Sequence, residues 1–223
     1  MNYQFSFAYI WGATPDLMAG LLMTIELSLL SIAIAAAIGV VCASVRLFRV
    51  PVLAQVATGY VNFIRSTPLL VQIFFIFYGL ASVGLPLGGF WSGVLALSLW
   101  GGAYMSENVR GGFAGVPEGL KEAAESLGLT PMLYLRFVAL PIGLRISIPT
   151  LLNTSISVLK NSSYLQAIGL AELTFAATTR VAMDFRTLEM FAAIGVLYLT
   201  LVVVLSWAVR RLEDRLHKPF RTA

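Results

Sequence analysis

Residues 118–141 read EGLKEAAESLGLTPMLYLRFVALP and form a short, mainly polar segment between long apolar runs. Its first apolar residues recur at positions i, i+3, i+4 and i+7, which is the period of one helical face; they are Leu120, Ala123, Ala124 and Leu127. The two alanines keep this face shallow, so a partner can approach it closely. Because a short helix has little of its own chain to pack on, the segment is predicted to be a docking element.

The ends of this short helix carry their own signals. Pro117 suits the first turn, and Gly128 suits the C-terminal cap because glycine takes a left-handed backbone without steric cost. Thr130 followed by Pro131 is typical of the N-cap and first position of another helix. The pattern therefore predicts two helices separated by a tight turn at Gly128.

The composition excludes a soluble globular domain. Hydrophobic residues make up 58% of the 223 residues and charged residues 12%, against roughly 45–50% and about 25% in soluble proteins. Leu27–Val45 and Met190–Val209 carry no charge and are 19 and 20 residues long, enough to cross a hydrocarbon core of about 30 Å. Ser66–Ser106 is uncharged over 41 residues, and the turn signal at Gly84–Gly89 indicates that two helices meet there.

We therefore predict an all-α integral membrane protein with about five transmembrane helices. No soluble segment is long enough for a second domain, so residues 1–223 are predicted to form one membrane domain, with the docking segment in a loop at about 114–141. Pro141 and Pro149 interrupt the fourth span. The predicted spans are residues 17–46, 52–81, 90–113, 132–165 and 188–210.

The distribution of lysine and arginine predicts the orientation, because loops on the cytoplasmic side of a membrane carry an excess of these residues. With the N-terminus outside and the C-terminus inside, only Arg180 and Arg186 fall on the outside, in a loop near 166–187. This orientation places the docking segment in the cytoplasm. The eleven residues on the cytoplasmic side are Arg46, Arg49, Arg110, Lys121, Arg136, Arg145, Arg210, Arg211, Arg215, Lys218 and Arg221.

The sequence lacks the motifs of several enzyme classes. It has no Gly-x-x-x-x-Gly-Lys-Ser/Thr loop for ATP, no cluster with metal-ligand spacing and no nucleophile elbow. The single histidine, His217, lies in the basic C-terminal tail, and the single cysteine, Cys42, lies in the first span. We interpret the tail as a stop-transfer flank rather than a nucleic-acid-binding segment. No cofactor is predicted in this chain, so any energy source must come from a partner.

Charged residues inside the predicted spans are candidate site residues, because a charge is costly to bury in a bilayer. Arg65 begins the run Arg65-Ser66-Thr67-Pro68 in the second span. Pro68 frees a backbone carbonyl, and Ser66 and Thr67 offer hydroxyls beside it, so a kinked helix with a polar notch is predicted. The guanidinium suits the carboxylate of a transported solute; the alternative is a structural pair between Arg65 and Glu107.

Two further polar breaks interrupt the apolar sequence. Residues 160–163 (KNSS) lie near the end of the fourth span, where Asn161 can both donate and accept hydrogen bonds. For serines such as Ser163, the alternative is hydrogen bonding between helices. In the third span, Glu107 can pair with a substrate ammonium group or with Arg65. We interpret Arg110 as an anchor at the inner surface.

The docking segment resembles the EAA loop of bacterial ATP-binding-cassette (ABC) importer permeases. The family pattern is Glu-Ala-Ala, three residues, Gly, nine residues and Ile-x-Leu-Pro. Here EAA at 122–124 precedes Gly128 at that spacing, and VALP at 138–141 follows, with valine in place of isoleucine. In that family the helix fits a groove on a separate ATPase subunit, which implies the same role for Glu118, Leu120, Glu122, Ala123, Ala124, Leu127 and Gly128.

The three polar breaks look like those of the polar amino acid branch of these permeases, the histidine, glutamine and glutamate permease group. The resemblance covers residues 17–212 and implies the fold of a type I ABC importer permease with a cytoplasmic coupling helix. In that branch, the matching positions line a central cavity that contacts the α-amino and α-carboxylate groups of the substrate. Carried over to this chain, they are Arg65, Glu107 and Asn161, supported by Ser66, Thr67 and Ser163. Many relatives have Asp at the position of Asn161, and loss of that charge disfavours a cationic substrate.

The resemblance implies the permease subunit of an ATP-driven amino acid importer in a bacterial inner membrane. The implied partners are an ABC ATPase that carries ATP and magnesium, a second permease subunit (identical or a sister chain) and a periplasmic or tethered substrate-binding protein. The spans would alternate between outward- and inward-facing states as the ATPase dimer closes. One rival interpretation is an ATPase-independent channel or secondary transporter for small polar solutes, which the shortage of intramembrane carboxylates disfavours. The other is an intramembrane enzyme, but the spans contain no nucleophile–base or metal set.

Overall fold

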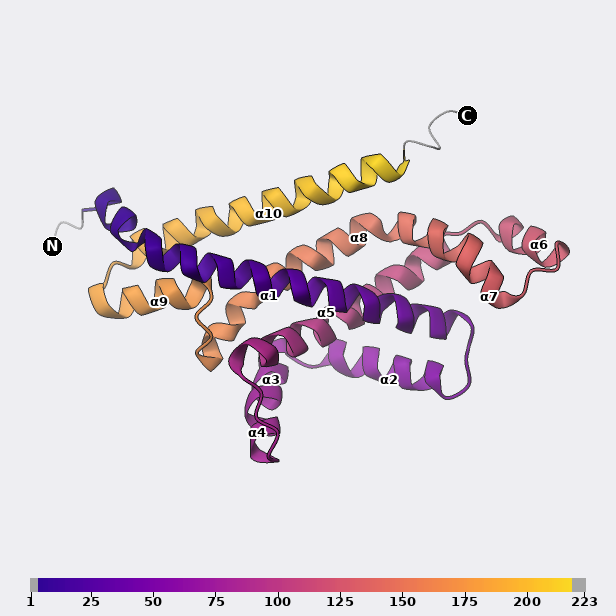
Figure 1. The fold of residues 1–223 in the computed structure, drawn as a ribbon, viewed down its shortest axis with the longest axis horizontal. Helices are drawn as coiled ribbons and strands as arrows, with labels where there is room; N and C mark the ends of the chain where they lie inside the picture. Colours follow the sequence, from indigo (N-terminus) through magenta and orange to yellow (C-terminus); the bar gives the residue numbers. More distant parts are fainter. Residues whose placement is uncertain (1–3, 218–223) are drawn as a thin grey trace. The chain divides into compact units, whose positions relative to one another are not determined.

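The chain is helical throughout its regular elements in the computed structural model, which describes the backbone of residues 4–217 and the side chains of residues 4–211 (Figure 1). Two π-helical segments and one 3₁₀ helix continue α-helices without a gap: η1 (Phe75–Gly79), η2 (Leu135–Ala139) and η3 (Ser162–Ile168). This arrangement confirms the all-α prediction. The α-helices are α1 (Phe7–Leu47), α2 (Leu53–Ser66), α3 (Leu69–Phe74), α4 (Leu80–Ser82), α5 (Gly89–Ala114), α6 (Glu118–Ser126), α7 (Pro131–Tyr134), α8 (Leu140–Asn161), α9 (Leu173–Asp184) and α10 (Thr187–His217).

Three helical stretches in the described residues are long and apolar enough to cross a membrane; they are Phe7–Leu47, Pro131–Ile168 and Thr187–Arg211. A fourth span results if Leu53–Ser66 and Leu69–Ser82 are taken as one broken span. These four correspond to four of the five predicted spans. The fifth prediction, 90–113, coincides with α5, which is 26 residues long but is not among the helices that are apolar enough by this measure to cross a membrane.

The helix boundaries differ from the predicted spans at several places. α1 begins at Phe7 rather than at residue 17 and keeps Pro15 in its interior, although proline lacks the N–H that an interior position donates. In the fourth span, the π-helical turn η2 precedes Pro141, and Pro149 lies within α8. The predicted outer loop at 166–187 contains the helix α9. The basic tail predicted beyond Arg211, with Arg215, His217, Lys218 and Arg221, lies outside the described side chains.

The chain divides into two compact units, each built from separate stretches of sequence. The first unit contains the residues up to Ser31, Leu70–Leu97 and Ile156–Trp207; the second contains Ile32–Leu69, Ser98–Ser155 and the residues from Ala208 on. The helices α1, α5, α8 and α10 each have residues in both units. A single membrane domain over residues 1–223 stays a prediction.

In the first unit, α9 packs against the N-terminal part of α1 and the beginning of α10 (Figure 1). Gly20 of α1 allows a close approach, because a Cβ atom there would lie 2.9 Å from the Cα atom of Leu173. The hydroxyl of Thr24 accepts the N–H of Leu173 at 3.1 Å. The buried side chains shared by the three helices are Ala13, Leu17, Leu173, Ala177, Met190 and Ile194.

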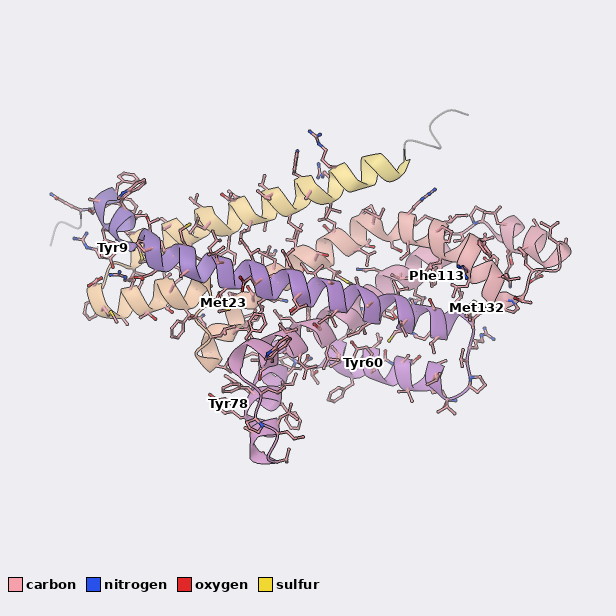
Figure 2. The ribbon with its side chains drawn as sticks, viewed as in Figure 1. Tyr9, Met23, Tyr60, Tyr78, Phe113 and Met132 are labelled. Atoms are coloured by element: carbon pink, nitrogen blue, oxygen red, sulfur yellow. The ribbon has the colours of Figure 1, made fainter. Side chains whose placement is uncertain are left out.

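In the second unit, α5 packs closely against α8. Phe113, labelled in Figure 2, lies against Gly143, where an added Cβ atom would be 2.5 Å from the phenylalanine ring. The hydroxyl of Ser147 donates to the carbonyl oxygens of Gly143 at 2.8 Å and Asn108 at 3.1 Å. Small residues and a bridging hydroxyl therefore hold these two helices together, as is common between membrane helices.

The helix α2 packs on the same helix α5 through a second apolar cluster. Val61 and Ile64 are buried there together with Ala103. The hydroxyl of Tyr60, labelled in Figure 2, donates to the carbonyl oxygen of Leu99 at 2.6 Å. These contacts orient the end of α2, where the first polar break lies.

Candidate coupling helix and substrate-contact residues

The helix α6, which is the predicted coupling helix, ends with the cap that the sequence predicts. Gly128 has a left-handed backbone, with a φ of 72°. Its N–H donates to the carbonyl oxygen of Glu125, and the N–H of Leu129 donates to that of Ala124, both at 3.0 Å. This pair of hydrogen bonds is a Schellman motif, which satisfies the last carbonyl groups of a helix. The prediction of a glycine cap is confirmed.

The neighbouring helix ends also follow local signals. Pro117 is the N-cap residue of α6, one position before the predicted first turn. Thr130 caps α7, and its side-chain oxygen accepts the N–H of Leu133 at 3.4 Å, with Pro131 at the first helical position. The chain therefore turns sharply between the two helices, as predicted.

The predicted docking face of α6 is divided between the surface and the interior. Ala124 is only 3% exposed, and with Leu47 and Phe113 it lines a cavity of about 500 Å³. Its methyl group therefore packs on its own chain. Leu127 is 80% exposed, and the docking role stays a prediction for it and for the other exposed residues, Glu118, Leu120, Glu122, Ala123 and Gly128.

The first polar break ends the helix α2. Thr67 has an extended backbone (φ −115°, ψ 144°), as expected before a proline. Its hydroxyl donates to the carbonyl oxygen of Phe63 at 3.0 Å and lies 3.4 Å from that of Ile64. Pro68 is predicted to free the carbonyl of Ile64, but that oxygen accepts the N–H of Thr67 at 3.5 Å. The shorter bond of the hydroxyl goes to Phe63. The helix is broken at Thr67 rather than kinked.

Arg65 stacks on an aromatic ring of α5. Its side chain is exposed, and its guanidinium carbon lies 5.3 Å from the centroid of the Tyr104 ring, within the range of a cation–π contact. The ring orients the guanidinium, and no carboxylate of residues 4–211 lies within 4.0 Å of its nitrogens. This geometry suits recognition of an anionic group.

Glu107 pairs with two other arginines. Its Oε1 accepts from Nη1 of Arg46 at 2.5 Å, and its Oε2 accepts from Nε and Nη2 of Arg110 at 3.0 and 2.8 Å. The structure therefore does not form the alternative pair between Arg65 and Glu107, and Arg110 is a direct partner of the carboxylate. Contact of Glu107 with a substrate stays a prediction.

The second polar break, residues 160–163, lies where α8 ends and the 3₁₀ helix η3 begins. The hydroxyl of Ser162 donates to the carbonyl oxygen of Leu159 at 2.7 Å, and that of Ser163 donates to that of Lys160 at 2.9 Å. Both serines thus bond to their own helix. The half-buried amide of Asn161 makes no hydrogen bond to any residue that the structure describes, so its donors and acceptor are available to a ligand.

The predicted substrate-contact residues belong to different units. Arg65, Ser66, Thr67 and Glu107 lie in the second unit, and Tyr104 and Glu107 share one face of α5 at spacing i, i+3. Asn161 and Ser163 lie in the first unit. That the two groups line one cavity stays a prediction.

Sequence reasoning missed a buried polar cluster at the start of α9. The carboxylate of Glu172 is fully buried and accepts the N–H groups of Thr174 at 3.0 Å and Phe175 at 2.7 Å, as well as the hydroxyl of Tyr198 at 3.0 Å. Burial raises the pKa of the Glu172 carboxyl. The available signal was an acidic residue directly before an apolar segment. Over residues 4–211, no group of three or more His, Cys, Asp or Glu could hold a metal ion.

Comparison with known proteins gives consistent matches over the whole chain. Residues 35–218 match the family described as binding-protein-dependent transport system inner membrane component. The glutamine transport system permease protein GlnP of Escherichia coli (strain K12) is 37% identical over 215 residues, which cover 96% of this chain and 98% of that protein. The probable amino-acid ABC transporter permease protein PatM of Vibrio harveyi is 32% identical over 219 residues, covering 97% and 98%. A chain in the crystal structure of an amino acid ABC transporter with histidines superposes with a TM-score of 0.87 at 32% identity, covering 96% of this chain and 100% of that one.

Proposed function

The chain belongs to the family of binding-protein-dependent transport system inner membrane components, and we propose that it couples amino acid import to an ATPase on a separate subunit. It is a permease subunit of the amino acid ABC importer type, with the fold of those permeases. Its place is the inner membrane of a bacterial cell, with the N-terminus outside and the C-terminus in the cytoplasm.

The observation that carries the coupling role is the geometry of α6. The helix has nine residues, presents Leu120 and Leu127 to the surface and is closed by the cap at Gly128. A short helix held at a defined angle transmits a rigid-body movement, whereas a flexible loop does not. We infer that α6 docks on an ABC ATPase, which binds ATP and magnesium, and that the permease itself has no catalytic activity.

The remaining partners follow from the type of transporter. A second permease subunit, identical or a sister chain, completes the translocation pathway, and a periplasmic or tethered binding protein delivers the substrate. Closure of the ATPase dimer then shifts the spans between outward- and inward-facing states. Within the pathway, Arg65 binds the carboxylate of the amino acid, and the neutral amide of Asn161 favours an uncharged side chain over a cationic one.

Co-purification and reconstitution test this function directly. The full chain, purified from its native membrane, is expected to carry an ABC ATPase in stoichiometric amount and, in proteoliposomes with its binding protein, to take up an amino acid only with ATP. Uptake that needs no ATPase and follows an ion gradient would instead establish a secondary transporter. A thermal-shift screen of the complex against the amino acids would identify the substrate.

Arg65→Lys is expected to lower uptake about tenfold or more, because lysine keeps the charge but loses the two-pronged contact with a carboxylate. The measurement is the initial uptake rate over a range of substrate concentrations. Since the side chain is exposed, the complex should assemble normally. Arg210→Lys, the same change at an exposed position in α10, should transport as the unmodified chain does. Unchanged uptake by Arg65→Lys would remove Arg65 from the substrate site.

Cysteine labelling is expected to show that α6 and α9 lie on opposite sides of the membrane. In a Cys42→Ala background, a cysteine at Ser126, exposed on α6, should react only with membrane-permeant reagents. A cysteine at Met183, which is 68% exposed on α9, should react with impermeant reagents added to intact cells. The reverse pattern would invert the orientation and exclude docking of α6 on a cytoplasmic ATPase.

A further inference from the structure

A positively charged cavity lies in the second unit, where α1 ends and α2 begins. Its volume is about 550 Å³, within the range of small-ligand sites. Three of its lining residues are arginines, Arg46, Arg49 and Arg110, and no carboxylate of residues 4–211 lines it. Gln55 and Thr58 of α2 add neutral polar groups to the wall.

The positive charge of this cavity is only partly compensated. Glu107 is shared by Arg46 and Arg110, and these contacts use one nitrogen of the first guanidinium and two of the second. Each guanidinium carries five N–H donors, so donors remain on both. Among residues 4–211, no carboxylate lies within 4.0 Å of the Arg49 guanidinium nitrogens. The three arginines therefore keep an excess of two positive charges.

The connection between α1 and α2 contains two residues with a left-handed backbone, one of which is Arg49 in the cavity lining. Arg49 and Val52 have φ values of 50° and 65°, a region that is unfavourable for residues other than glycine and most of all for a β-branched one. At Arg49 this backbone belongs to the cap that ends α1, because the N–H of Arg49 donates to the carbonyl oxygen of Arg46 and the N–H of Val50 donates to that of Val45, both at 3.2 Å. This cap fixes the backbone of Arg49 at the end of α1, three residues after Arg46.

The apolar run before Arg46 predicts that the cavity lies at the depth of the lipid headgroups. Leu27–Val45 is uncharged over 19 residues, which is close to the length that spans a hydrocarbon core of about 30 Å. Arg46 is the first charged residue after this run, so its guanidinium is expected at the border between the hydrocarbon and the headgroup layer. Phosphate groups of anionic lipids lie at the same depth, and basic pockets between helices bind such headgroups.

We propose that Arg46, Arg49 and Arg110 form a binding site for a phosphate group, supplied by the headgroup of an anionic phospholipid. Guanidinium groups bind two phosphate oxygens at once through paired N–H donors, which a lysine ammonium does not. The amide of Gln55 adds a donor for a phosphate or headgroup oxygen. Free phosphate in solution offers the same chemistry, so the experiment separates the two sources.

The test measures lipid retention by the full chain in nanodiscs of phosphatidylcholine mixed with phosphatidylglycerol. Native mass spectrometry counts the phosphatidylglycerol molecules that remain bound. Arg49→Gln is expected to weaken this binding about tenfold or more, because one charge-assisted contact with phosphate is lost. Glutamine has an unbranched stem like arginine, so the strain at this position is unchanged. Arg49→Lys should bind with intermediate affinity.

Arg210→Gln is the matched control, because it removes the same charge from an exposed position that does not line the cavity. It should retain phosphatidylglycerol as the unmodified chain does. A second arm adds inorganic phosphate to nanodiscs of phosphatidylcholine alone and measures the melting temperature. Stabilisation by inorganic phosphate that Arg49→Gln abolishes, without any preference for phosphatidylglycerol, assigns the same site to free phosphate.

Two results would overturn the proposal. In one, neither phosphatidylglycerol nor inorganic phosphate distinguishes the unmodified chain from Arg49→Gln. In the other, Arg210→Gln loses phosphatidylglycerol as much as Arg49→Gln does, so that the attraction is a general property of the basic surface. The melting temperature of Arg49→Gln in phosphatidylcholine alone shows whether this variant folds. If it does not fold, lipid retention by Arg49→Lys is compared with that of the unmodified chain instead.

Discussion

Replacing Gly128 with valine is expected to abolish most ATP-coupled transport while the chain still inserts and folds. Gly128 has a φ of 72°, and a β-branched residue in that conformation costs roughly 1–2 kcal/mol. A Cβ atom there would meet nothing within 4 Å, so the effect arises from the backbone alone. The cap would rearrange, and α6 would leave the angle at which it docks.

The measurement is uptake together with substrate-stimulated ATP hydrolysis in the reconstituted complex. The two activities should fall together, or the ATPase should dissociate from the permease. Gly128→Asn is the matched control, because asparagine tolerates a left-handed backbone and should retain most of the activity. If Gly128→Val transports normally with its ATPase bound, α6 is not the coupling helix.

Gly112→Ala is expected to destabilise the second unit strongly. An added Cβ atom at Gly112 would overlap the hydroxyl oxygen of Ser147 and the carbonyl oxygen of Gly143. Because a backbone oxygen cannot turn aside, α5 and α8 would have to separate, at a cost of about 1–3 kcal/mol for overpacking. The hydrogen bonds of the Ser147 hydroxyl, to Gly143 and Asn108, would be lost as well.

The adjacent residue provides the control for this prediction. Gly111 is in the same helix, and a Cβ atom there would meet nothing within 4 Å. Gly111→Ala should therefore leave the melting temperature unchanged or raise it slightly, since alanine favours a helix over glycine by roughly 0.5–1 kcal/mol. The melting temperature and the yield of monodisperse protein in detergent measure both variants. Equal melting temperatures for the two would contradict the close approach of α5 and α8.

Features that depend on neighbouring residues and on composition could be predicted from the amino-acid sequence. The glycine cap at Gly128 and the N-cap at Thr130 follow from the backbone preferences of single residues, which act within one helical turn. Membrane spans were readable because the bilayer demands a long uncharged run wherever a helix crosses it. The family signature could also be recognised, because all of its residues lie within one continuous segment.

The contacts between side chains that are distant in the sequence became evident only in the folded chain. The helical period predicts that Leu120, Ala123, Ala124 and Leu127 share one face, but not that Ala124 would be buried against the chain while Leu127 stays exposed. In the same way, Glu107 could be recognised as a costly charge, yet its partner Arg46 is 61 residues away. Such a pair forms because the end of α1 packs beside α5, and packing between distant segments leaves no mark in the local pattern of either one.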